Sequence, residues 1–306
     1  MTDPLIRRWT PSWQVPVAQI WSCWRRGAGD PTYVIDSAGR HWRALRTPTG
    51  TATLLVESLP SLGSLEASAW GEGASWALEA LPTMLGAQDH PDGLVPQHEA
   101  LARALHAHPH WRVGRGGVVW AALLPAVVEQ KVTGAEAFAG FRRLVHRFGT
   151  PAPGPVGSLR LRVPPSADEV RRIPSWEWLR LPVDPARSGT ALRAAAVASS
   201  LERTLADPLA VADRKLRSVP GVGVWTSAEV RQRAHGDPDA VSFGDYHVAR
   251  NISWALVGEQ LGDDAVRELL EPYRGHRYRV QRLLELAGNG HPRHGARMPP
   301  RTHLPG

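Results

Sequence analysis

A short stretch near residue 220 has residues that could bind a phosphate. A carboxylate follows it after one loop. Pro220-Gly221-Val222-Gly223 separates two segments whose apolar residues have helical spacing, so the sequence predicts a helix, a tight turn and a second helix. Glycines let backbone N–H groups approach a phosphate, and the N-terminus of the second helix favours the same anion. The carboxylate is Asp245, at the start of a third helical pattern. This stretch therefore predicts a phosphate contact beside an acidic group.

The order of residues around this turn forms a motif that is specific enough to compare with known families. It reads L-x-x-V-P-G-V-G-x-W-T over Leu216–Thr226, and a loop that ends in Gly244-Asp245-Tyr246 follows it. The pattern resembles the helix-hairpin-helix DNA glycosylase superfamily, and most closely its 3-methyladenine DNA glycosylase II branch. The resemblance extends upstream over Val118–Gly149 and downstream over Glu271–Gly288, and more weakly into the N-terminal part.

By motif position, the resemblance implies that Asp245 is the catalytic aspartate. Cleavage of an N-glycosidic bond passes through an oxocarbenium-like state at the deoxyribose C1′, which a carboxylate can stabilise, or the carboxylate orients the attacking water. A base alkylated on a ring nitrogen is already cationic and needs no general acid, which suits a site with one carboxylate. The alternative is that Asp245 only caps the helix that begins at Tyr246, and the two roles are compatible.

The resemblance also implies a substrate pocket, in which this sequence departs from the family. Trp225 stands where lyase members carry a catalytic lysine, so no Schiff base can form and we predict a monofunctional enzyme. Its indole suits a cationic purine, or it packs the hairpin into the core. Glu229 and Arg282 stand where the family has aromatic residues; Glu229 could favour a cationic base, pair with Arg282 or face solvent. Candidate replacement aromatics are Tyr246, Tyr273 and Tyr278.

Several residues are expected to contact DNA. Gln130-Lys131 matches the place from which the family inserts a side chain into the gap left by a flipped nucleotide. The related branch has an apolar residue there, so Lys131 either fills the gap with its methylene groups or is a solvated loop lysine. His247 could bind a phosphate or be structural. The other expected DNA contacts are Pro220, Gly221, Val222, Gly223, Thr226 and Ser242.

Composition narrows the class of protein. The single cysteine, Cys23, excludes a disulfide framework and a four-cysteine iron–sulfur cluster, and it indicates a reducing compartment. Residues 1–90 carry 7 Arg against 8 acidic residues, a net charge of −1, while the remainder carries 29 basic against 21 acidic residues, a net charge of +8. The basic part is the part with the hairpin, as a DNA-backbone binder requires, although a bias towards arginine would give the same excess.

The sequence also indicates which cofactors and binding partners to expect. No apolar run approaches the length of a membrane span and no signal peptide is present, so we expect a cytoplasmic, nucleoid-associated protein without a membrane partner. His106-x-His108-x-His110 lacks an acidic or cysteine partner, so we predict no metal site. The resemblance leaves a monovalent cation at the hairpin carbonyls open. The expected partner is double-stranded DNA with a damaged base, bound by a monomer.

The periodicity predicts a mainly α protein with an N-terminal α+β domain, and the resemblance implies helical lobes that flank a substrate cleft. Residues 1–90 read as a small antiparallel sheet plus a helix, residues 91–288 as the helical glycosylase region, and residues 289–306 as a basic, Pro-rich tail, expected to be disordered. Strands are predicted at 13–24, 32–35, 41–45, 51–56 and 65–70. Helices are predicted at 74–85, 97–106, 117–129, 134–148, 175–181, 184–205, 207–219, 225–233 and 273–287, after 245, and from 166 and 263, with a loop over 150–165.

Three hypotheses for function follow. The first is a monofunctional DNA glycosylase that removes alkylated purines such as 3-methyladenine and 7-methylguanine in base excision repair. The second is a helix-hairpin-helix protein that binds DNA without catalysis. The third is an enzyme of the same fold that excises a deaminated or oxidised base.

Overall fold

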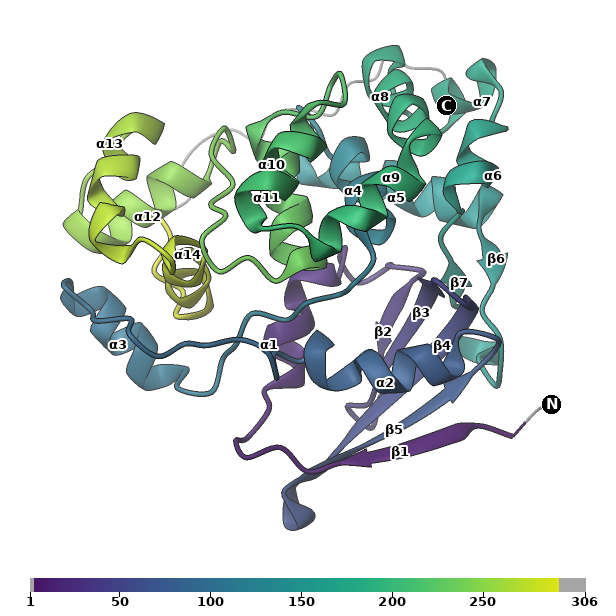
Figure 1. Ribbon diagram of the computed structural model, residues 1–306, viewed down its shortest axis with the longest axis horizontal. Helices are drawn as coiled ribbons and strands as arrows, with labels where there is room; N and C mark the ends of the chain where they lie inside the picture. Colours follow the sequence, from purple (N-terminus) through teal and green to yellow (C-terminus); the bar gives the residue numbers. More distant parts are fainter. Residues whose placement is uncertain (1–2, 292–306) are drawn as a thin grey trace.

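The computed structural model describes residues 3–291 and places a five-stranded antiparallel sheet below a helical body (Figure 1). The strand order in the sheet is β1-β5-β4-β3-β2. The strands are β1 (Leu5–Trp9), β2 (Tyr33–Ile35), β3 (His41–Thr47), β4 (Gly50–Leu59) and β5 (Ser64–Trp70). Alternate residues of β4 and β5 are fully buried against helix α2 (Ala74–Met84), which covers one face of the sheet.

The N-terminal prediction is confirmed for four strands and the helix, and it is wrong over residues 13–24. That segment forms α1 (Val17–Trp21) and a 3-10 turn (Ser22–Trp24). The reason is the spacing of Val17, Ile20 and Trp21, which are buried together on one helical face. Strand β1, which lies at the sheet edge with mostly exposed residues, was not predicted.

The helical body is built around α4 (Val119–Val128), which is buried along nearly its whole length. Its first two free amides, of Val119 and Trp120, donate to the carboxylate of Glu202 at 2.8 and 2.7 Å. The surrounding helices are α3 (Glu99–Ala107), α5 (Gly134–Phe148), α6 (Ala167–Arg171), α7 (Ser175–Arg180), α8 (Pro185–Ala196), α9 (Ala198–Glu202), α10 (Leu209–Arg217), α11 (Val224–Val230), α12 (Val248–Val257), α13 (Asp263–Leu269) and α14 (Arg277–Leu286). The helix predicted at 117–129 thus lies at the centre of the body.

Local capping signals locate several helix ends correctly. Thr133 and Glu136 form a capping box at the start of α5, and Ser166 and Glu169 form one at the start of α6, close to where the sequence predicts each helix to begin. The single helix predicted over 184–205 is wrong, because the chain breaks at Val197 into α8 and α9. The loop predicted over 150–165 is confirmed except for two short paired strands, β6 (Thr150–Pro151) and β7 (Arg162–Val163), and a 3-10 turn at Gly157–Leu159.

One hydrophobic core links the sheet to both groups of helices, since a single buried cluster runs from Val17 to Leu284. α4 to α11 form one group, and α12 to α14 with α3 form the other (Figure 1). No helix within residues 3–291 is both long and apolar enough to cross a membrane. Of the predicted C-terminal tail, residues 292–306 lie outside the described part of the chain.

Candidate functional site

The predicted hairpin is present between α10 and α11. Val219 and Val222 are buried and anchor the turn, while Pro220, Gly221 and Gly223 are exposed. Gly221 has a φ of +95°, a conformation that favours glycine. The turn therefore presents backbone rather than side chains to solvent, as a phosphate contact requires.

Side chains from two other helices fix the hairpin. The Arg193 guanidinium donates to Pro220 O at 2.9 Å. The Gln130 amide donates to Gly221 O at 2.9 Å and to Thr226 Oγ1 at 2.8 Å, so Gln130 ties the end of α4 to the hairpin. Thr226 is buried, and its hydroxyl faces Gln130 rather than solvent, which corrects the expectation that it contacts DNA.

Lys131 directly follows Gln130, which is hydrogen-bonded to the hairpin. Its side chain is exposed and its φ of 54° lies in the left-handed region, which is uncommon for a residue with a side chain. Since Gln130 is held against the hairpin, the position of Lys131 relative to the hairpin is set by the backbone. This placement is compatible with the wedge role and does not test it.

The monovalent cation at the hairpin stays a prediction. The carbonyl oxygens of Pro220 and Gly221 each accept one hydrogen bond, from Arg193 and from Gln130 respectively. Among residues 3–291, no group of three His, Cys, Asp or Glu side chains could hold a metal ion.

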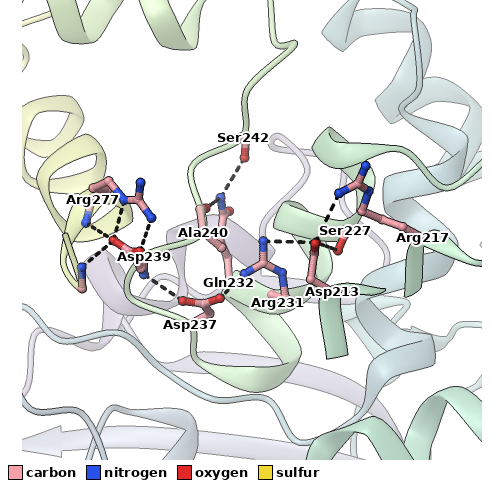
Figure 2. A network of polar contacts seen from close by, with 11 residues as sticks. Asp213, Arg217, Ser227, Arg231, Gln232, Asp237, Asp239, Ala240, Ser242 and Arg277 are labelled. Atoms are coloured by element: carbon pink, nitrogen blue, oxygen red, sulfur yellow. Dashed lines mark hydrogen bonds and ion pairs between the residues drawn. The ribbon is translucent and has the colours of Figure 1, made fainter. Parts of the chain in front are cut away.

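A chain of polar contacts connects the hairpin helices to the loop that carries Asp245 (Figure 2). Asp213 on α10 lies 3.4 Å from the Arg231 guanidinium, which also pairs with the buried Asp237. Asp237 accepts the amide of Asp239 at 2.8 Å, and Asp239 in turn pairs with Arg277 at the start of α14. Helix α10, the loop and α14 are therefore held in one arrangement.

A second set of contacts holds the loop from inside. Gln232 donates to Ala240 O at 2.6 Å and to Ser242 Oγ at 2.7 Å, as Figure 2 shows. The Ser242 hydroxyl donates to Glu229 Oε1 at 2.5 Å. Ser242 is only 1 % exposed, so the expectation that it contacts DNA is corrected: its hydroxyl is used within the protein.

Gly244 brings the loop against the hairpin helix. It has a φ of +89°, and its amide donates to Asp263 Oδ2 at 2.7 Å. A Cβ built on Gly244 would lie 3.9 Å from Trp225 Cβ in the first turn of α11. Asp263, predicted as the cap of its own helix, is instead the first residue of α13 and holds this loop. The residue before Asp245 is thus fixed beside the hairpin.

Asp245 combines the two roles that the sequence left open. Its Oδ1 accepts the amides of His247 at 2.7 Å and Val248 at 3.3 Å, so it caps α12, which begins at Val248 rather than at Tyr246. Among residues 3–291, Asp245 has no ion pair, and its Oδ2 accepts no hydrogen bond. Its side chain lines a cleft of about 610 Å³. One oxygen therefore stabilises the helix while the other is available to a ligand.

The cleft lies between α11 and the C-terminal helices α12 and α14. Apart from Asp245, the described residues that line it are Cys23, Glu229, Gln232, Arg233, His247, Val248, Asn251, Tyr278, Gln281, Arg282, Glu285, Gly288, Gly290 and His291. Two predicted pocket residues, Glu229 and Arg282, are therefore brought together with Asp245. The sequence analysis missed Arg233, Gln281 and Glu285, although Tyr278, Gln281, Arg282 and Glu285 recur at the three- and four-residue spacing of one helix face.

The charges that line the cleft are paired, with one exception. Glu229 pairs with Arg233 at 2.6 Å and Arg282 pairs with Glu285, so Glu229 does not pair with Arg282. Burial alone would lower the pKa of Arg233, but the Glu229 carboxylate raises it above its ordinary value. The carboxylate of Asp245 is the unpaired charge among the described lining residues, which leaves the cleft with a net negative charge.

The candidate aromatics are placed differently from one another. Tyr278 is buried and lines the cleft, and burial raises the pKa of its hydroxyl. Tyr246 is 74 % exposed and packs edge-on against His247, outside the lining. Tyr273 is a core residue whose hydroxyl contacts His98 Nδ1 at 2.6 Å, so its predicted place in the pocket is corrected. Trp225 is partly buried beside Gly244 and is not among the lining residues.

No protein-family model and no curated protein matches this sequence. Solved structures do match over nearly the whole chain. The 3-methyladenine DNA glycosylase from Archaeoglobus fulgidus is 18 % identical with a TM-score of 0.72, and the match covers 91 % of this chain and 97 % of that one. The 8-oxoguanine glycosylase/lyase from Clostridium acetobutylicum, in complex with double-stranded DNA, is 10 % identical with a TM-score of 0.68, over 93 % and 97 %. MBOgg1 with a low-affinity DNA ligand is 12 % identical with a TM-score of 0.71, over 93 % and 94 %. This protein has the helix-hairpin-helix DNA glycosylase fold.

Proposed function

We propose that this protein is a monofunctional DNA glycosylase that hydrolyses the N-glycosidic bond of a damaged purine, with Asp245 as its catalytic carboxylate. The observation that carries the proposal is the free Oδ2 of Asp245 in a cleft beside an exposed glycine turn. The fold supports it, since the matched structures include DNA glycosylases of both the alkylated-base and the oxidised-base kind. The partner is double-stranded DNA in the cytoplasm, bound by a monomer.

The geometry suggests how the parts act together. The hairpin amides contact a backbone phosphate, and the damaged nucleotide is turned out of the duplex into the cleft. As the bond to the base breaks, positive charge develops at C1′, and the carboxylate of Asp245 stabilises it or orients water towards it. Because the other charged groups that line the cleft within residues 3–291 are paired among themselves, none of them competes for Asp245.

The electrostatics of the cleft favour an alkylated purine as the substrate. A purine methylated on a ring nitrogen is cationic, and the cleft carries an unpaired negative charge at Asp245. Glu229 is neutralised by Arg233 and accepts from Ser242, so it adds a polar surface rather than a second net charge. A neutral base would gain less from this field.

A base-release panel tests the substrate class. Duplexes that contain 3-methyladenine, 7-methylguanine, hypoxanthine or 8-oxoguanine are incubated with the protein, and the free base is measured. We expect release of the two methylated purines to be at least about tenfold faster, which corresponds to roughly 1.4 kcal/mol of difference between the transition states. Faster release of hypoxanthine or 8-oxoguanine would instead assign the protein to the third hypothesis.

The absence of lyase activity is a second prediction. The chain has only two lysines: Lys131 is exposed on its loop, and Lys215 pairs with Asp207 at 2.8 Å. Neither lines the cleft, and Trp225 stands where a catalytic lysine would be expected. The abasic product is expected to stay unbroken until alkali is added, and borohydride to trap no covalent adduct. A trapped adduct that disappears in Lys131→Ala would show that the enzyme is bifunctional.

The proposed contact between the hairpin and a phosphate can be tested only at a glycine whose substitution leaves the fold intact. A Cβ on Gly221 would lie 2.1 Å from Thr190 Oγ1 and would sit at positive φ, so any change there disturbs the fold. In contrast, no heavy atom of the described residues lies within 4 Å of a Cβ built on Gly223. Gly223→Val is therefore expected to keep the melting temperature while weakening DNA binding roughly tenfold and lowering its dependence on salt.

Val224→Ala, one position further into α11 with an exposed side chain, is the matched control. It is expected to bind as the wild type does. Equal affinities of Gly223→Val and Val224→Ala for a duplex would exclude the hairpin as the phosphate contact.

A second candidate function, DNA binding without catalysis, is favoured by one observation: Asp245 does cap α12. Substitution of Asp245 separates the two functions, because the cap needs only Oδ1.

A further inference from the structure

A cavity of about 50 Å³ lies between the sheet and the helical body, away from the cleft. Three arginines line it: Arg26 from the segment after α1, and Arg43 and Arg46 from β3. The rest of its wall is largely aromatic and apolar and includes Trp24, Tyr33 and Phe141, but none of the residues that line the cleft.

Two of the three arginines have a carboxylate partner. Arg26 pairs with Glu129 at 2.7 Å and also donates to Trp24 O at 3.0 Å. Arg46 pairs with Glu169 at 2.9 Å and donates to Pro164 O at 3.0 Å. Their charges are therefore balanced within the protein.

Arg43 is the exception. It is only 6 % exposed, yet within residues 3–291 its guanidinium makes no hydrogen bond and no ion pair. Its Cζ lies 4.9, 4.7 and 5.9 Å from the ring centroids of Trp21, Trp24 and Tyr33. Aromatic faces attract a cation, but they leave the five N–H donors of the guanidinium without acceptors.

The nearby carboxylate, Asp30, favours the charged form of Arg43, but it lies beyond ion-pair distance and its oxygens accept hydrogen bonds from other groups. It accepts the amides of Arg26 at 2.7 Å and Thr32 at 2.8 Å, and the Thr32 hydroxyl at 2.8 Å. Burial lowers the pKa of Arg43 to about 10, so the guanidinium is still charged at neutral pH. A buried guanidinium that has neither a direct ion pair nor a hydrogen-bond acceptor is strongly unfavourable.

We propose that the cavity binds a small monovalent inorganic anion, such as chloride, on the Arg43 guanidinium. The anion supplies the direct ion pair and the hydrogen-bond acceptor that the guanidinium lacks. The volume admits a few groups the size of water and excludes a nucleotide or a sugar phosphate. The site joins β3 to the helical body and does not depend on the proposed glycosylase function.

The direct test uses the wild-type protein crystallised in bromide. Anomalous scattering at the bromine edge is expected to show a peak in the cavity, at hydrogen-bonding distance from Arg43. A cavity whose density is fully explained by water, with no anomalous peak, would overturn the proposal.

A solution test measures the melting temperature in sodium chloride and in sodium gluconate at equal ionic strength. Chloride is expected to raise it by roughly 2–4 °C with saturation, because a ligand that binds only the folded state stabilises it. Arg43→Met, which keeps the length and apolar stem of the side chain, is expected to lose this difference between the salts.

Arg8→Met, at an exposed arginine of the same sheet, is the control and should keep the difference. A difference that persists in Arg43→Met, or equal melting temperatures of the wild type in the two salts, would contradict the site. Should Arg43→Met fail to fold, the wild-type salt comparison and the bromide crystal still decide.

Discussion

Asp245→Asn is expected to slow the release of an alkylated purine by roughly 10²- to 10³-fold, which is the loss typical when one group that stabilises transition-state charge is removed. Asparagine keeps a carbonyl oxygen that can accept the amides of His247 and Val248, so the cap on α12 is retained. What is lost is the negative charge on the free oxygen. DNA affinity and melting temperature are therefore expected to stay near those of the wild type.

The measurement is single-turnover base release from a methylated duplex, with DNA binding followed in parallel. Asp263→Asn is the matched control, because it removes a carboxylate that contacts the same loop at Gly244 but lies outside the cleft lining. A wild-type rate for Asp245→Asn at unchanged affinity would leave Asp245 as a helix cap only, and would favour the function of DNA binding without catalysis.

The largest expected effect on stability comes from Asp89, which joins the start of the helical body to α14. Its two oxygens lie 2.6 and 2.7 Å from the two terminal nitrogens of Arg279, and both side chains are almost fully buried. One of these oxygens also accepts the amide of Val113 at 2.8 Å. Asp89→Ala would leave a buried guanidinium and a buried amide without partners, so we expect a loss of about 3–5 kcal/mol in the free energy of unfolding.

Denaturant unfolding at neutral pH measures this loss. The control is Glu99→Ala, which breaks the exposed ion pair with Arg103 and should cost less than about 1 kcal/mol. If the two variants lose similar, small amounts of stability, the buried Asp89–Arg279 pair does not make the large contribution to stability that we expect.

Elements with a strong local signal were predictable from the sequence. The capping box at Thr133 and the apolar run of α4 both depend on residues within a few positions of one another, and the structure has both. The hairpin was predictable for the same reason, because Pro220–Gly223 can continue neither helix. The pairing of Glu229 with Arg233 also lies within reach of local reasoning, since the two residues are four apart on one helical face.

The burial of side chains beside the candidate site was not predictable. Ser242 and Thr226 stand next to functional positions in the sequence, but tertiary packing turns both inward. Tyr273 was assigned to the pocket by sequence position, whereas its hydroxyl reaches the segment before α3, some 175 residues away. Burial in such cases depends on which distant segment covers the residue, and one sequence contains no periodic signal for that.

The hydrogen bonds and the ion pair of the segment between Gln232 and Asp245 limit how this part of the gene can change during evolution. Gln232 reaches Ala240 and Ser242, and Asp239 reaches Arg277, so an inserted or deleted codon here would shift those partners out of reach together. In related proteins we therefore expect this segment to vary by substitution while its length stays the same. The segment 155–160, which lies between β6 and β7 and is mostly exposed, is where lineages can differ in length.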